Sequence, residues 1–325
     1  MSKLTSAFAK TYGNDDSHKE REPAQVWFAD CPLGLMLFVV FFTKACRWGR
    51  CLGCNLPSLS SSKDVAFDAI MRQVDTLYAR RDVRKRLTEI RNIVLSNNGS
   101  VFDEETFSTT ALIYFLAKTN MLVPNLSLLT IETRPEYVEM SELDMLARAI
   151  REGKTPTELE VAIGMEAFDD RIRNKGFIKG LSFGEVERLA EKLARHSFRL
   201  RVYFMQKPVP DMSDEEAVRD IQDGIDFLAK LAARYDIAVT MHLNPTYVAH
   251  GTALERAFRN GTYIPPKLSD VARAARYADG KRVGVYLGLY DEGLAVPGGS
   301  FIRPGEEEVV ERLMAFNRTT DFSLL

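Results

Sequence analysis

The chain has little of what would indicate a secreted, membrane-spanning or nucleic-acid-binding protein. Four cysteines among 325 residues are too few for a disulfide framework. The longest apolar run, residues 33–42, is roughly half as long as a membrane-spanning helix. The 43 Lys and Arg residues are balanced by 45 Asp and Glu residues, and the net charge of -2 gives no general attraction to nucleic acid or to anionic membranes.

Several familiar sequence signatures are also missing. There is no Gly-rich dinucleotide fingerprint, no phosphate-binding loop with its lysine and no short fixed repeat. The first residues are polar and charged, without the apolar stretch of a secretory signal. With 46% hydrophobic and 27% charged residues, the chain can bury a large core. We therefore expect a cytoplasmic, enzyme-sized globular protein that does not associate with a membrane.

Apolar β-rich segments alternate with amphipathic helical segments along most of the chain. Expected strands cover residues 36–43, 92–97, 126–133, 160–165, 199–205, 238–243 and 283–289. Expected helices cover residues 64–78, 104–117, 142–151, 183–196, 214–234 and 252–260. Strands that are apolar on both faces need helices on both sides. The sequence predicts an α/β fold with a partial (β/α)6 TIM-type barrel at residues 26–290, a flexible arm at 1–25 and a C-terminal extension at 291–325.

Three cysteines, Cys46, Cys51 and Cys54, fall within nine positions in the loop after the first expected strand. Catalytic residues of barrels lie at that end of the strands. Three thiolates can bind three irons of a 4Fe-4S cluster and leave the fourth iron open. The alternative is a structural zinc site in a non-enzymatic binding module, for which Cys31 is the nearest further ligand. Cys31 is otherwise explained as a small buried apolar residue.

The CxxxxCxxC spacing resembles the radical SAM superfamily, whose usual motif is CxxxCxxC with an aromatic residue before the last cysteine. This chain has one extra residue in the first spacer, and Gly53 stands where the aromatic residue normally helps hold adenine. The resemblance implies that S-adenosyl-L-methionine (SAM) binds the open iron and is cleaved reductively to a 5'-deoxyadenosyl radical, which abstracts hydrogen from a substrate. It also implies an electron donor such as flavodoxin or ferredoxin.

Further blocks are similar to the branch that contains the Elongator catalytic subunit. The segment SNNGS places Asn98, Gly99 and Ser100 where the superfamily binds the amino group of SAM, and a glycine lets the backbone approach closely. The segment ETRPE resembles a block in which Glu132 would accept hydrogen bonds from ribose hydroxyls or the ammonium group. Arg134 would donate a forked pair of hydrogen bonds to the SAM carboxylate.

The segment IGMEAFDDRIRNKG resembles the Gly-Leu-Glu-Ser and Asn-Lys-Gly elements of the same branch. It implies a cofactor role for Glu166 and for Lys175, which either pairs with Glu166 or meets SAM. Together these blocks, over residues 38–289, look most like the radical SAM subunit of archaeosine synthase and its uncharacterised relatives. That family cleaves a carbon-nitrogen bond on a modified 7-deazaguanine in tRNA, after another subunit has attached lysine.

Polar residues at the ends of the fifth and sixth expected strands are candidates for substrate contacts. They are Tyr203, Gln206, Lys207, His242, Asn244 and Tyr247. Lys207 also reads as the start of a surface loop, Asn244 as a turn residue and His242 as a satisfied core histidine. The substrate is either a modified tRNA nucleoside or a small molecule of a biosynthetic pathway, which the near-neutral charge favours. The basic run 79–86 is either a solvated surface or an RNA contact.

Overall fold

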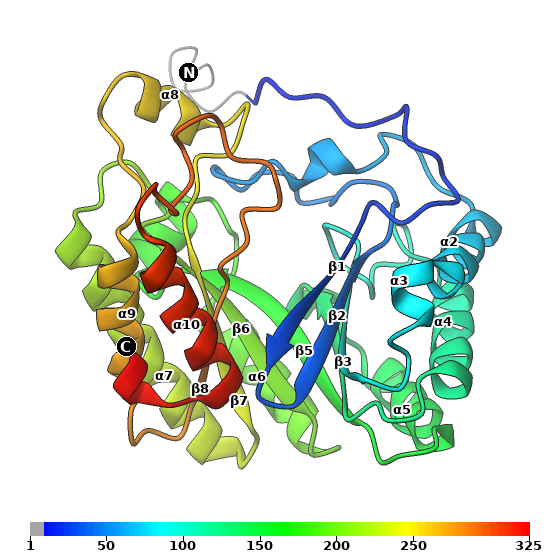
Figure 1. Cartoon of the computed structure of the whole chain (residues 1–325). Helices are drawn as coiled ribbons and strands as arrows, with labels where there is room; N and C mark the ends of the chain where they lie inside the picture. The colour runs from blue at the N-terminus through cyan, green and yellow to red at the C-terminus, as the bar shows by residue number, and fades with distance from the viewer. Residues whose placement is uncertain (1–9) are drawn as a thin grey trace.

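The computed structural model describes residues 10–325, and within them a curved eight-stranded sheet forms the centre (Figure 1). The strands are β1 (Gln25–Cys31), β2 (Gly34–Val40), β3 (Ile90–Ser96), β4 (Leu128–Thr133), β5 (Glu158–Glu166), β6 (Arg199–Gln206), β7 (Val239–Pro245) and β8 (Gly284–Leu287). They lie side by side in chain order. From β2 to β8 each strand is parallel to the next. The predicted α/β partial barrel is confirmed.

Helices cover the outside of this half-barrel (Figure 1). They are α2 (Phe67–Ala79), α3 (Arg81–Arg84), α4 (Thr109–Leu122), α5 (Met140–Ala149), α6 (Phe183–Ala194), α7 (Asp214–Tyr235), α8 (Ala253–Arg259), α9 (Leu268–Arg276) and α10 (Glu307–Thr319). Short helical turns are η1 (Leu56–Leu59), η2 (Pro135–Tyr137), η3 (Ile150–Glu152), η4 (Arg171–Gly176) and η5 (Phe322–Leu324). No helix in the described part of the chain is long and apolar enough to cross a membrane.

The first strand corrects the sequence-based prediction. The expected strand 36–43 corresponds to β2, which is parallel to β3, but the prediction missed β1, which pairs with β2 in an antiparallel hairpin whose turn includes Leu33. Gly34 makes this turn possible because its φ of +116° is a conformation that other residues rarely adopt. Leu33 is 47% exposed, so it lies outside the core. The sheet therefore begins with an antiparallel strand that the pattern of apolar residues did not predict.

Two local features explain how α7 is placed against the sheet. At its N-terminus, Ser213 and Glu216 form a capping box that satisfies free backbone N–H groups. In its middle, Gly224 faces β6 so closely that a Cβ atom there would lie 2.6 Å from the ring of Phe204. Only glycine allows this approach, so the backbone of α7 can pack closely against β6.

The sheet stays open between its edge strands β1 and β8, and α10 packs over the opening. Asn317 of α10 accepts a hydrogen bond from the Leu287 N–H and donates one to the Leu287 carbonyl, both at 2.8 Å. The side-chain amide thus makes the two hydrogen bonds that the backbone of a neighbouring strand would otherwise make with Leu287. The Tyr286 hydroxyl also donates to the carbonyl of Asp30 at 3.3 Å, which joins β8 to β1. We call this junction the seam.

A buried ion pair lies in the interior of the half-barrel. Arg201 Nε is 2.7 Å from Glu160 Oε2, with side-chain exposures of 7% and 0%. Thr130 donates a further hydrogen bond to the same carboxylate at 2.9 Å. The pair connects β5 to β6 below the cavity described next, on the side of each strand that faces it.

Residues 10–24 run along the top of the molecule as drawn in Figure 1, beside the cysteine-containing loop. The Tyr12 hydroxyl donates to the carbonyl of Cys54 at 2.9 Å, and Asn14 donates to the carbonyl of Pro57 at 2.9 Å. Lys10 donates to the carbonyl of Gly49 at the same distance. The predicted domain boundaries remain a prediction, but this part of the predicted arm contacts the loop that follows β2.

Candidate active site

A cavity of about 570 Å³ lies at the carboxyl ends of the strands. Most of the residues predicted for the site line it: Cys46, Cys51, Cys54, Asn98, Gly99, Glu132, Arg134, Glu166, Tyr203, His242 and Asn244. Tyr247 lines it as well, whereas Gln206 is buried elsewhere. The chain order of the strands explains this gathering, because each parallel strand delivers its carboxyl end to the same rim.

Besides Gln206, three of the predicted site residues do not line the cavity. Ser100 is buried behind it and accepts a hydrogen bond from the Arg134 N–H at 3.1 Å. Lys175 is exposed at the surface. Lys207 pairs with Asp214 at 2.6 Å, and its φ of +62° opens the loop before α7. The structure therefore favours the reading of Lys207 as the start of a loop.

The three clustered cysteines are free thiols that face the same cavity. Burial raises the pKa of Cys51 and raises that of Cys54 to about 12, and in each case another of the three sulfurs adds to the shift. A metal that binds them must displace these protons. Within residues 10–325, no three His, Cys, Asp or Glu side chains converge as around a single metal ion. A cubane binds each thiolate at a different iron, so its ligands need not converge.

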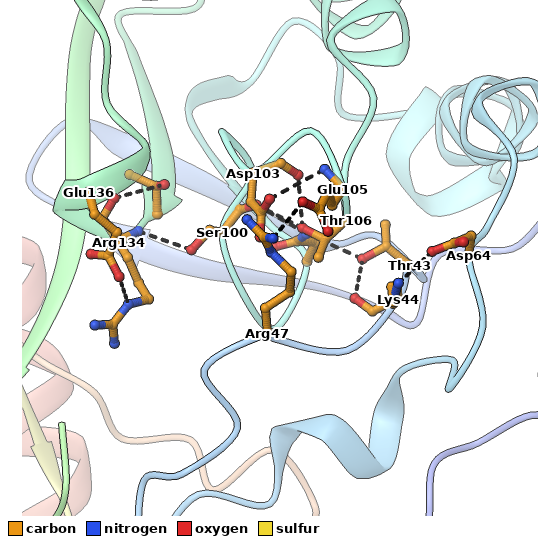
Figure 2. Close-up of polar contacts among 12 residues, drawn as sticks. Thr43, Lys44, Arg47, Asp64, Ser100, Asp103, Glu105, Thr106, Arg134 and Glu136 are labelled. Atoms are coloured by element: carbon orange, nitrogen blue, oxygen red, sulfur yellow. Dashed lines mark hydrogen bonds and ion pairs between the residues drawn. The ribbon is translucent and has the colours of Figure 1, made fainter. Parts of the chain in front are cut away.

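The cysteine loop is braced against the loop that follows β3 (Figure 2). Arg47 lies next to Cys46 in the sequence, and its Nε donates to the buried carboxylate of Asp103 at 2.7 Å. A second contact joins Arg47 to Glu105 at 2.6 Å. Thr43 accepts a hydrogen bond from Asn97 at 3.2 Å. These contacts fix the first cysteine relative to the adjacent loop before any ligand binds.

The Asn98–Gly99 turn approaches Cys46 closely. A Cβ atom on Gly99 would lie 3.3 Å from the Cα atom of Cys46, so the two backbones are nearly in contact. Asn98 has a φ of +58° and is 8% exposed, and its side-chain Nδ2 has no hydrogen-bond partner in the described structure. A buried N–H group without a partner is costly and points to a ligand that would accept from it.

Glu132 and Tyr203 form a hydrogen-bonded pair across β4 and β6. The Tyr203 hydroxyl donates to Glu132 Oε1. Burial raises the pKa of Glu132. Burial and the Glu132 carboxylate together raise the pKa of Tyr203 well above 10, so the phenol stays protonated at neutral pH. Tyr203 therefore acts as a donor that holds Glu132 in place.

Arg134 contacts protein groups at three of its nitrogens. Its Nε lies 2.5 Å from Glu136, and its two terminal nitrogens donate to the carbonyls of Lys179 and Gly180, each at 3.1 Å. The guanidinium also lies 4.7 Å from the centre of the Trp48 ring. It thereby joins the end of β4 to the cysteine loop and to the segment after η4. Its predicted contact with the SAM carboxylate remains a prediction.

The partner of Glu166 is Lys179, not Lys175 as one reading of the sequence predicted. Lys179 Nζ lies 2.7 Å from Glu166 Oε1, and both side chains are nearly buried. Burial disfavours the charged lysine, but the carboxylate outweighs it and raises the pKa of Lys179. The π-helical turn η4 and the positive φ values of Ile178 and Gly180 direct Lys179 toward the cavity. Helical spacing alone could not have predicted this arrangement.

Gly164 provides the space for this ion pair. A Cβ atom there would lie 2.3 Å from Glu166 Oε1 and 2.5 Å from Lys179 Nζ, so both side chains would have to move. We expect Gly164→Ala to leave the fold intact, because both groups end flexible side chains, and to weaken SAM binding by about tenfold. Anaerobic equilibrium dialysis with SAM measures this loss.

Gly184→Ala on α6 is the matched control, since its Cβ would lie at ordinary distances from the Arg188 side chain, 3.4 Å, and from Ser182 Oγ, 4.0 Å. It should bind SAM like the unmodified chain. Unchanged SAM affinity in Gly164→Ala would show that the Glu166–Lys179 pair does not take part in binding.

Gly53 stands where the resemblance implies an aromatic side chain, and the ring of Phe177 lies beside it. A Cβ atom on Gly53 would be 3.2 Å from the Phe177 ring and 3.0 Å from Leu254. The Leu52 N–H also donates to the Phe177 carbonyl at 2.8 Å, which fixes this segment beside the cysteine loop. Phe177 is almost fully buried and lines the cavity.

Comparisons with known proteins found relatives by sequence and by fold. No family model matches the chain. Archaeosine synthase subunit beta of Methanosarcina acetivorans is 27% identical over 79% of this chain and 72% of its own length. The protein of the same name from Thermococcus kodakarensis is 25% identical over 72% of this chain and 69% of its own length.

Among solved structures, SuiB of Streptococcus suis bound to S-adenosylmethionine matches with a TM-score of 0.50 at 13% identity. The match covers 80% of this chain and 51% of SuiB, so the chain spans about half of that protein. This likeness concerns the fold alone. The sequence relatives confirm the predicted resemblance to archaeosine synthase subunit beta.

Proposed function

We propose that this chain is a radical SAM enzyme that binds a 4Fe-4S cluster through Cys46, Cys51 and Cys54. The observation that carries the proposal is that three free thiols share one cavity with the Asn98–Gly99 turn and with Glu132. Thiolates are the usual ligands of such clusters. When bound, the cluster and SAM would supply the one-electron cleavage that yields a 5'-deoxyadenosyl radical.

The residues of the chain would bind and orient SAM. Asn98 Nδ2 has no hydrogen-bond partner within residues 10–325 and would donate to the cofactor. Glu132, positioned by Tyr203, would accept from the ribose hydroxyls or the ammonium group. The Glu166–Lys179 pair would present one carboxylate and one cation to the polar end of SAM. Phe177 would provide the apolar surface that Gly53 cannot give to adenine.

For the substrate, we propose a modified 7-deazaguanine nucleoside in tRNA, on which the radical starts a lyase-type carbon-nitrogen cleavage. The relatives named archaeosine synthase subunit beta support this choice. A small molecule of a biosynthetic pathway is the second candidate, and the near-neutral net charge of -2 favours it. An electron donor of the flavodoxin or ferredoxin type would serve either reaction.

Anaerobic reconstitution tests the proposal. The chain should turn brown with about four irons bound. With dithionite it should convert SAM to 5'-deoxyadenosine, detected by chromatography. A colourless protein that binds zinc instead would refute the proposal. Binding of tRNA that weakens steeply with salt would favour the nucleoside substrate, and its absence would favour the small molecule.

A further inference from the structure

One side of the cavity, formed by β1, β2 and the segment after β8, has no role in the proposed cofactor site. Trp27 of β1 stacks on its cross-strand partner Phe38, with ring centroids 4.1 Å apart and planes 11° apart. Tyr290 lies on the seam side, with its ring centroid 5.1 Å from that of Trp27. All three rings line the cavity. Aromatic walls of this kind suit a flat heterocyclic ring.

Glu292 lies beside this wall and has no cationic partner among the described residues. Its only side-chain contact there is the Tyr247 hydroxyl, which donates to Oε2 at 3.0 Å. Burial raises the pKa of Glu292 to about 7, so the protein itself does little to stabilise its charge. A carboxyl group turned toward a cavity without a cation is well placed to accept hydrogen bonds from a ligand.

The backbone at Glu292 is held in an unusual conformation. Its φ is +57°, in the left-handed region that residues other than glycine rarely adopt. Gln25 of β1 donates to the Glu292 carbonyl at 3.1 Å and fixes this turn to the edge strand. Strained residues of this kind concentrate at functional sites, because the surrounding structure holds them there.

His242 is a second polar residue in the cavity, and one of its two ring nitrogens makes no hydrogen bond in the described structure. The residue is 6% exposed, and this nitrogen is Nδ1. Its ring lies between Tyr203 and Tyr286, at centroid distances of 4.5 and 4.9 Å. Burial and the nearby Arg201 hold the pKa of His242 well below 6.5, so the imidazole is neutral. A neutral imidazole can give or accept a hydrogen bond with an uncharged polar ligand.

We propose that Glu292, assisted by Tyr247, recognises the hydrogen-bond-donor edge of a guanine-type ring that lies along the wall of Trp27, Phe38 and Tyr290. Two adjacent N–H groups on such an edge match the two oxygens of a carboxylate. The rings of the wall and the separate imidazole of His242 suit a flat, extended ligand better than a small ion. This inference rests on the proposed function and names the residues that would select its substrate.

The test compares guanosine with inosine, which lacks only the 2-amino group. Binding is measured by anaerobic equilibrium dialysis with the cluster-loaded, SAM-bound enzyme. The unmodified enzyme should bind guanosine more tightly, because inosine leaves one carboxylate oxygen without a partner. Glu292→Gln should weaken guanosine binding by roughly 10- to 100-fold and remove the preference. Tyr247→Phe should show a smaller loss, since the carboxylate remains.

Asp30→Asn is the matched control. It also removes one carboxylate at the seam, where Asp30 lies 3.8 Å from Arg318, and it should keep the guanosine preference. Iron content and melting temperature show whether Glu292→Gln has retained its fold. If the variant is misfolded, Tyr247→Phe and the guanosine to inosine ratio of the unmodified enzyme decide the question.

Several outcomes would overturn the inference. The unmodified enzyme could bind guanosine and inosine equally, or bind neither, or Glu292→Gln could keep the preference. If Glu292→Gln abolishes binding of n-butylamine instead, the site takes a cationic amine and the base-recognition role is wrong. An iron-loaded, SAM-cleaving chain without guanosine preference refutes this inference alone. A chain that binds no iron refutes the proposed function and this inference with it.

Discussion

Cys51→Ser is expected to lose its bound iron and to release no 5'-deoxyadenosine above background. Two thiolates cannot hold a cubane at three of its irons, and a serine hydroxyl is a poor replacement for the soft sulfur ligand. Iron is measured per chain after anaerobic reconstitution, and 5'-deoxyadenosine is measured with dithionite and SAM. Cys46 and Cys54 should behave in the same way, because all three thiols face one cavity.

Cys31→Ala is the control for this experiment. Cys31 is buried beside Met36 and Val94 of the half-barrel, and its thiol donates to the Gly34 carbonyl at 3.3 Å. This surrounding fits the small apolar residue that the sequence suggested. The variant should bind iron and cleave SAM like the unmodified chain. Loss of metal from Cys31→Ala, or full iron in Cys51→Ser, would contradict the three-cysteine cluster.

Glu160→Leu is expected to lower the free energy of unfolding by about 3–5 kcal/mol. The change leaves Arg201 charged, buried at 7% exposure and without its carboxylate at 2.7 Å. It also leaves the hydroxyl of Thr130 without the acceptor that it contacts at 2.9 Å. Urea unfolding under anaerobic conditions, at equal iron content, measures the loss.

Two further variants separate this effect from a general loss of charge on β5. Glu158→Leu removes a 65% exposed carboxylate that pairs with Arg199 at 2.8 Å, and it should cost less than about 1 kcal/mol. Glu160→Leu combined with Arg201→Met should recover most of the stability, because no unpaired charge remains buried. If Glu160→Leu lowers the free energy of unfolding no more than Glu158→Leu does, the interior ion pair does not stabilise the fold.

The strands β2 to β8 were predictable because they are apolar on both faces, as a covered parallel sheet requires. β3 illustrates this, since Arg91 is the only residue in it that is not fully buried. β1 was missed for the opposite reason, because most of it is only partly buried and it pairs locally through the turn at Gly34. The helices α9 and α10 were also not predicted. Both helices are amphipathic, but the sequence did not indicate which strands they pack against.

The site was predictable where its residues follow one another in the sequence. The three cysteines share one loop, so their spacing alone indicated a metal site. Lys179 was missed because its direction depends on η4 and on two positive φ values rather than on a regular repeat. Trp27 and Glu292 were missed because they lie far apart in the sequence and line one cavity only because the segment after β8 returns to β1.

The two hydrogen bonds between Asn317 and Leu287 hold α10 against β8 and make it part of the cavity wall. Met314, Asn317 and Arg318 of α10 line the same cavity as the cysteines. A shortened chain that stops before residue 307 would therefore lose a wall and expose the bare edge of β8 to self-association. Anyone trimming this protein for crystallisation, or fusing a tag or partner behind it, should treat its final helix as indispensable.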